Sequence, residues 1–129
     1  MITTNNLELD KEYYEKLFED VIRNRQVCVI NLFENNRCIG KTTILNNVSN
    51  LCQITYGFPT IFITPYVKQE YVTNQVYTSN SFCRRHGWVN LPEHSVVFID
   101  EIQTNKDEVD TILGYLKSRQ IPVVGFISP

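Results

Sequence analysis

The sequence predicts an α/β fold in which helices flank both faces of a mostly parallel sheet. Two observations lead to this prediction. Four short runs are almost wholly apolar and rich in β-branched residues, as in strands that are buried on both faces. Segments with apolar residues at helical spacing lie between these runs, and such alternation is typical of parallel sheets with crossover helices.

The first half of the chain is expected to hold two helices and two strands. The first helix rests on apolar residues at positions 14, 17, 18, 21 and 22, which share one helical face. Asp10 is a suitable N-cap for it. The expected elements are, in order, a loose polar arm over 1–8, a helix from Asp10 to about Asn24, a strand over Gln26–Leu32, a helix over Thr42–Ile54 and a strand over Thr60–Thr64.

The second half continues the alternation. Apolar residues from Val67 to Val76 have a spacing that favours a helix within 67–85. Pro122 is tolerated because it lies near the start of its strand. The remaining expected elements are a strand over Ser95–Ile99, a helix over Asp107–Arg119 and a strand over Ile121–Ile127.

The composition indicates one ordinary globular domain. The 129 residues are 43% hydrophobic and 20% charged, a balance that can bury a core and argues against a disordered or collagen-like chain. Twelve basic and fourteen acidic side chains give a net charge of −2, so a general basic coat for nucleic acid is absent. We expect one minimal domain over 1–129, with an amino-terminal arm and helix (1–25) and a core (26–129).

The sequence also bears on cellular location and on the state of the cysteines. No apolar run reaches the roughly 20 residues of a membrane span, and no signal-peptide pattern follows Met1. We therefore expect an intracellular protein that is not secreted and has no membrane partner. None of the cysteines has C-x-x-C spacing, so reduced structural thiols are expected at Cys28, Cys38, Cys52 and Cys83.

Residues 35–42 (NNRCIGKT) match the phosphate-loop pattern G-x-x-x-x-G-K-[ST] except at Asn35, which replaces the first Gly. An apolar strand precedes this loop and an amphipathic helix follows it, which is the context that the motif requires. Asn tolerates positive φ better than most residues and can therefore replace Gly. The other interpretation is an ordinary helix start at Gly40-Lys41-Thr42.

The residue types of the loop predict their roles. Gly40 allows close approach of the backbone to a phosphate, Lys41 reaches the β- and γ-phosphates, and Thr42 ligates Mg²⁺. The Arg37 guanidinium can stabilise charge on the γ-phosphate, unless it faces solvent. The predicted nucleotide-binding residues are Asn35, Asn36, Arg37, Cys38, Ile39, Gly40, Lys41, Thr42 and Thr43.

A second motif is the apolar run 96–99 (VVFI), which ends in Asp100-Glu101. We expect this strand beside the one that leads into the phosphate loop. Asp100 would hold Mg²⁺ and Glu101 would orient and deprotonate a water that attacks the γ-phosphate, although two acids can also form a solvated turn. The acidic pair and the missing N-K-x-D guanine motif favour ATP. Together the motifs predict the three-layer fold of P-loop nucleoside triphosphatases, with ATP and Mg²⁺ as cofactors.

Three further sites are less specific. Gln103 and Ser128 follow strand ends, where each could sense the γ-phosphate or simply be a loop or strand-end residue. The basic cluster Arg84-Arg85-His86 could contact DNA or a neighbouring subunit, but a solvated face is the preferred interpretation.

The motifs resemble the large terminase subunits, the DNA-packaging ATPases of tailed phages and herpesviruses. The Arg37-x-x-Gly40-Lys41-Thr42-Thr43 stretch is similar to their deviant Walker A, and 96–128 is similar to their Walker B, following helix and coupling strand. The resemblance implies that Lys41, Arg37 and Glu101 are catalytic, with Arg37 as a cis arginine finger. It further implies a nucleic-acid motor with double-stranded DNA as partner, a homo-oligomer or larger viral assembly, and a place in the host cytoplasm or nucleus.

Two other functions stay open at the level of sequence. Asp100-Glu101-Ile102-Gln103 and the strand that begins at Ile121 look like the corresponding part of type II thymidine kinases, in which Glu101 would take a proton from the nucleoside 5′-hydroxyl. Asn35 in place of Gly and the short chain also suit a degenerate nucleotide-binding or assembly module without turnover.

Overall fold

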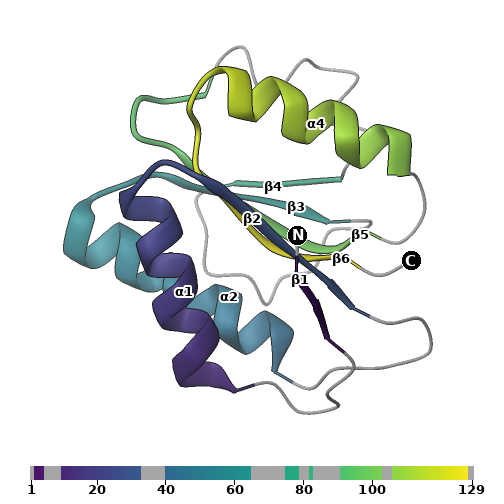
Figure 1. Ribbon diagram of the computed structural model, residues 1–129. Coiled ribbons are helices and arrows are strands. Elements are labelled where there is room, and N and C mark those ends of the chain that lie inside the picture. Colours follow the sequence, from purple (N-terminus) through teal and green to yellow (C-terminus); the bar gives the residue numbers. More distant parts are fainter. Residues whose placement is uncertain are drawn as a thin grey trace.

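Six parallel strands form one sheet in the computed structural model, in the order β1-β2-β6-β5-β3-β4 (Figure 1). The structure describes residues 2–4, 10–32, 40–64, 75–78, 82, 91–102 and 106–127. Every neighbouring pair in the sheet is parallel. The strands are β1 (Ile2–Thr4), β2 (Val27–Leu32), β3 (Thr60–Thr64), β4 (Gln75–Thr78), β5 (Val96–Ile102) and β6 (Val123–Ile127).

Helices lie on both sides of this sheet, and the predicted α/β class is confirmed. Figure 1 shows α1 and α2 on one face and α4 on the other. A π-helical segment, η1, continues α2 directly. None of the helices within the described ranges has the length and apolar character needed to cross a lipid bilayer. The helical segments are α1 (Lys11–Arg23), α2 (Lys41–Leu51), η1 (Cys52–Tyr56) and α4 (Lys106–Ser118).

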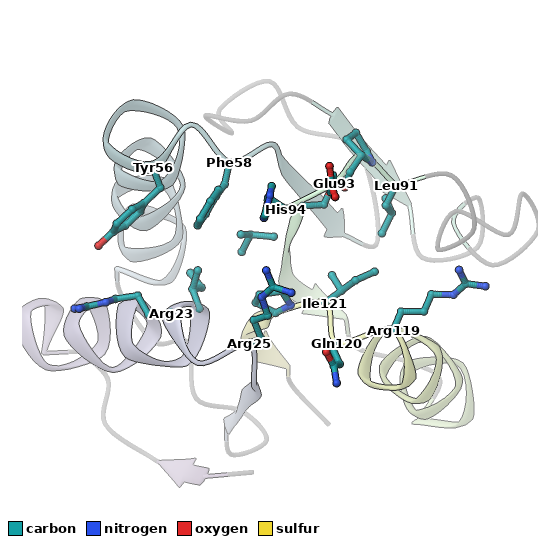
Figure 2. A pocket seen from close by; sticks show the side chains of 15 residues that line it. Arg23, Arg25, Tyr56, Phe58, Leu91, Glu93, His94, Arg119, Gln120 and Ile121 are labelled. Carbon is teal, nitrogen blue, oxygen red and sulfur yellow. Dashed lines mark hydrogen bonds between the residues drawn. The ribbon is translucent and has the colours of Figure 1, made fainter.

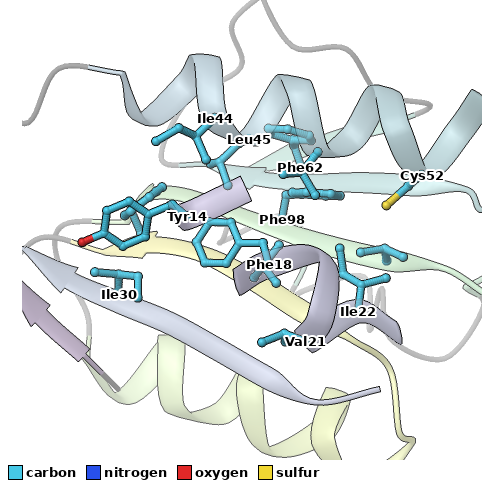
Figure 3. Close-up of a cluster of buried hydrophobic side chains, with 14 residues drawn as sticks. Tyr14, Phe18, Val21, Ile22, Ile30, Ile44, Leu45, Cys52, Phe62 and Phe98 are labelled. Carbon is cyan, nitrogen blue, oxygen red and sulfur yellow. The ribbon is translucent and has the colours of Figure 1, made fainter. Parts of the chain in front are cut away.

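The sheet buries side chains on both faces because its central strands are apolar throughout. On the side of α1 and α2, Phe62 and Phe98 stack with ring centroids 5.0 Å apart, and Phe18 of α1 is fully buried in the same cluster (Figure 3). On the side of α4, Ile112 and Leu116 are fully buried. This two-sided burial agrees with the apolar runs from which the strands were predicted.

Helix α1 follows the sequence prediction closely. Asp10 is its N-cap and the carboxylate accepts a hydrogen bond of 3.1 Å from the Tyr13 backbone N–H. The helix ends at Arg23, with Asn24 as C-cap. Cys28 and Cys52 are free thiols, as expected, while Cys38 and Cys83 lie outside the described residues.

The loose arm expected over 1–8 is wrong for its first residues. Ile2–Thr4 form the edge strand β1, which pairs with β2 so that Ile2 lies opposite Ile30. A three-residue strand is too short to show a period, so the sequence pattern gave no signal. Two β-branched threonines after Ile2 suit a strand, and pairing with β2 supplies hydrogen-bond partners for the backbone.

The helix expected within 67–85 is also wrong where the structure describes this segment. Gln75–Thr78 form strand β4, which pairs with β3 so that Val76 lies opposite Phe62. The apolar residues that suggested a helix were few, and Val67, Tyr71 and Val72 lie outside the described residues. At Val76, pairing with β3 overrides the weak helical spacing, which is a common outcome for short segments.

Candidate functional site

The candidate site lies at the edge where the parallel strands end. Strand β2 ends at Leu32 and β5 ends at Ile102. Because the strands are parallel, these ends share one edge of the sheet, and α2, which runs back along the sheet, begins there at Lys41. Ligands of open α/β sheets bind at this edge.

Gly40 is the N-cap of α2. Its φ of 100° is a left-handed conformation that favours Gly, and among the described residues no side-chain hydrogen bond caps the helix. The Gly40 carbonyl accepts the first helical hydrogen bond, 2.9 Å from the Ile44 N–H. The first N–H groups of a helix lack partners within it and carry partial positive charge. This end of α2 is therefore suited to an anion.

The two sequence motifs meet at this point. The Thr42 hydroxyl donates a hydrogen bond of 3.1 Å to Asp100 Oδ2 across a separation of 58 residues. The Asp100 side chain is fully buried and its Oδ1 atom is buried as well. A carboxylate is expensive to bury unless it has compensating partners. The structure thus places the acid of the second motif against the hydroxyl of the first.

The acidic strand does not lie beside the strand that leads into the phosphate loop, so this expectation is wrong. Strand β6 lies between them and pairs with both: Gly125 is opposite Val29 of β2 and opposite Ile99 of β5. The crossover through α4 returns the chain to the space between β2 and β5. Helix α2 contacts β5, and this packing brings Thr42 to Asp100 in spite of the intervening strand.

Comparison of the chain with protein-family models, curated proteins and solved structures finds no match. Of the predicted site residues, the structure brings Gly40, Lys41 and Thr42 together with Asp100, and it places Thr43 on an exposed part of α2. The predicted residues that lie outside the described part of the chain are Asn35, Asn36, Arg37, Cys38, Ile39, Gln103 and Ser128.

Glu101 occupies an irregular position of the backbone. Asp100 pairs with Phe126 and Ile102 pairs with Ile127, so two steps along β5 correspond to one step along β6. Glu101 is the extra residue of this register shift. Such bulges are frequent next to active sites. The sequence motif identified Glu101, but the strand pattern gave no sign of the shift.

Gly125 allows β6 to lie close to the acidic strand β5, and it was not identified from the sequence as part of the site. Its φ is +155°, and a Cβ atom at this position would lie 2.0 Å from the backbone oxygen of Ile99, the residue before Asp100. Only Gly allows β6 to approach β5 this closely. A Gly inside an otherwise apolar strand was the available signal, because this pattern often marks close backbone approach.

A metal ion at this site would depend on few protein ligands. Within the described ranges, no group of three or more His, Cys, Asp or Glu side chains could hold a metal ion. Asp100 and Thr42 offer one carboxylate and one hydroxyl, both hard oxygen ligands. Magnesium is commonly held by one or two carboxylates together with phosphate oxygens and water, so this donor set fits Mg²⁺ bound with a nucleotide better than a dedicated protein cage.

Proposed function

We propose that the chain is a P-loop ATPase that hydrolyses ATP with Mg²⁺. The observation that carries the proposal is the hydrogen bond between Thr42 and Asp100, because it joins the end of the phosphate-loop motif to the buried acid of the second motif. Two motifs that are predicted to share one ion are thus in direct contact. The amino end of α2, with Gly40 as its N-cap, supports the same proposal, because helix amino ends favour anions.

Each residue of the site would have a separate role in the reaction. Lys41 and the first N–H groups of α2 would hold the phosphates, while Thr42 and Asp100 would hold Mg²⁺. The ion would neutralise charge on the phosphate oxygens. Glu101 would orient a water and accept its proton as the water oxygen bonds to the γ-phosphorus and the bond to the ADP oxygen breaks. Arg37, from the predicted loop, would stabilise the charge that develops.

The strand order supports a more specific proposal. One strand, β6, lies between β2 and the acidic strand β5. The additional-strand ATPases are a class of P-loop motors named for a strand inserted at this position. Terminases, which the sequence motifs resemble, belong to this class. We therefore propose a terminase-like nucleic-acid motor ATPase of viral origin, with double-stranded DNA and further copies of the chain or a viral assembly as partners.

The test is phosphate release from ATP with Mg²⁺, measured with and without double-stranded DNA. Lys41→Ala and Thr42→Ala should each lower turnover about 100-fold or more, because each removes a group that contacts the phosphates or the ion. Glu101→Gln should retain ATP binding and lose turnover to a similar extent. Thr111→Ala removes an exposed hydroxyl from α4, on the other face of the sheet, and serves as the matched control.

The outcomes separate the candidate functions. Turnover that rises with DNA and disappears in Glu101→Gln supports the motor. ATP binding without turnover in the unchanged protein indicates a binding module, and transfer of phosphate to added thymidine indicates a nucleoside kinase. If Thr42→Ala and Thr111→Ala bind ATP equally well and turn it over at equal rates, the candidate site is not the nucleotide site.

A further inference from the structure

A second hollow lies at the opposite edge of the sheet, where the strands begin. Its volume is about 610 Å³, a size within the usual range for small-ligand sites. It is formed by the segments that end α1, η1 and α4 and by the turn that leads into β5 (Figure 2). Its floor is apolar, since Ile22, Val96 and Pro122 are buried. Of the predicted nucleotide-site residues that the structure describes, none lines it.

Three stacked rings form one wall of this cavity. Tyr56 and Phe58 have ring centroids 5.4 Å apart with an interplanar angle of 19°, and Phe58 and His94 are 5.7 Å apart at 18°. Figure 2 shows these residues in a row above the space that the cavity occupies. His94 is exposed and forms the outer end of the row. Because the rings cover one another's inner faces, a planar group can stack on the outer face of the exposed His94 ring.

The backbone holds this aromatic row in place. The π-helical turn of η1 carries Tyr56, Gly57 then takes a left-handed φ of 67°, and the Phe58 N–H donates a hydrogen bond of 3.0 Å to the Cys52 carbonyl. The Tyr56 hydroxyl donates a hydrogen bond of 2.8 Å to Glu19 Oε1. Single π-turns are frequent at functional sites.

Three arginines line the side of the cavity opposite the aromatic row and are spread along it. Figure 2 shows Arg23 below Tyr56, Arg25 below His94, and Arg119 beyond them at the end of α4. Arg25 is fixed in a left-handed conformation with a φ of 53°, and its N–H bonds to the Ile22 carbonyl at 3.1 Å. Arg23 is near enough to Tyr56 to oppose the rise that the hydrogen bond to Glu19 causes in the pKa of the Tyr56 hydroxyl.

The charge balance of the lining favours an anion. Among the residues that the structure describes, the lining holds three arginines and one carboxylate, Glu93. Helices α1 and α4 and the η1 segment that continues α2 also end here, and a helix carboxyl end contributes roughly half a negative charge. Three full positive charges outweigh one carboxylate and three half charges by about half a unit. The cavity therefore combines an aromatic wall, an apolar floor and an excess of arginine.

We propose that this cavity binds a nucleotide unit, with its base stacked on the outer ring face of His94, at the exposed end of the aromatic row, and its phosphate held by Arg25 and Arg119. Stacking on aromatic rings together with arginine contacts to phosphate is the general chemistry of single-stranded nucleic-acid recognition. The same chemistry would take a free mononucleotide. This site is separate from the proposed ATPase site, which lies at the other edge of the sheet.

The test is fluorescence anisotropy of a labelled ten-nucleotide oligothymidylate without Mg²⁺ or ATP. The double variant Arg25→Asn with Arg119→Gln should bind about tenfold more weakly or worse, and the salt dependence should become shallower. Asn is chosen at position 25 because it tolerates left-handed φ. The matched control, Lys16→Gln with Lys117→Gln, removes the same charge from exposed positions of the same two helices outside the cavity.

A second variant tests the stacking wall. His94→Asn removes the exposed ring while keeping a residue that tolerates the φ of 63° at this position, and it should weaken binding by at least about fivefold. Circular dichroism on heating checks that each variant is folded. Competition by thymidine monophosphate would identify a mononucleotide site, whereas competition by oligonucleotide alone would identify a nucleic-acid strand as the ligand.

Several results would overturn the proposal. It is wrong if neither oligothymidylate nor thymidine monophosphate binds. It is also wrong if the arginine variant and the lysine control lose the same amount of oligothymidylate affinity. Equal competition by inorganic phosphate or by polyglutamate would show that no base is recognised. Lys41→Ala should leave this binding unchanged even if the ATPase proposal fails. Loss of binding in Lys41→Ala would place the ligand at the other edge.

Discussion

Replacing Gly125 by Ala tests how tightly the fold holds the acidic strand in place. An added Cβ would lie 2.0 Å from the Ile99 oxygen, 2.7 Å from its nitrogen and 2.8 Å from its carbonyl carbon. All three atoms belong to the backbone of β5, so no flexible side chain can move aside. The φ of +155° is also one that residues with a side chain rarely adopt. Strands β5 and β6 would have to separate locally.

The size of the effect follows from these two terms. Overpacking of a well-packed interior costs about 1–3 kcal/mol, and a strained backbone conformation costs about 1–3 kcal/mol more. We therefore expect Gly125→Ala to lower the free energy of unfolding by about 4 kcal/mol, which is a large share of the roughly 5–15 kcal/mol of an ordinary domain. With a slope near 2 kcal/mol per molar urea, the midpoint should fall by about 2 M.

The assay is urea unfolding followed by circular dichroism, with Gly114→Ala as the control. Gly114 lies in α4, and a Cβ there would have no atom within 4 Å. Ala in a helix interior is favoured over Gly by about 1 kcal/mol, so this variant should be more stable than the unchanged protein. Gly125→Ala with an unchanged midpoint would refute the close approach of β6 to β5, and with it the strand order that positions Asp100.

Two further predictions concern the N-cap of α1 and the buried thiol of Cys52. Asp10→Ala should lower the free energy of unfolding by about 1 kcal/mol, because the N-cap bond to Tyr13 is lost; urea unfolding measures this, and no change would mean that the cap contributes nothing. Burial, aided by Glu19, raises the pKa of Cys52 from 9.0 to about 12. The folded thiol then stays protonated where the unfolded one ionises, so stability should fall as pH rises from 9 towards 12. Cys52→Ala should flatten this part of the pH profile.

Local patterns predicted the elements whose signals lie within a few residues. Apolar spacing and Asp10 located α1 to within one residue, and the run of apolar residues at 60–64 matches β3. The helix expected from Thr42 begins at Lys41, and the acidic strand expected to end at Ile99 starts at Val96 and continues to Ile102, so that Asp100 lies within β5. These features depend on neighbours in sequence.

Features that depend on partners distant in sequence were missed. Strands β1 and β4 exist through pairing with β2 and β3, and neither has enough residues to show a period. The position of β6 between β2 and β5 depends on the path of the α4 crossover. The cavity at the other edge draws Arg25, Phe58 and His94 from three separate segments. No local pattern could have joined them.

The direction of the helices explains why the two edges of the sheet need different side chains to bind anions. Helices α1, α2 and α4 each follow a parallel strand, so all begin at the edge of Asp100 and end at the edge of the cavity. Positive helix ends favour phosphate at the first edge, where Lys41 adds one full charge. At the second edge the helix ends oppose an anion, and only side chains can reverse this. The presence of Arg23, Arg25 and Arg119 there is therefore the arrangement that anion binding at this edge requires.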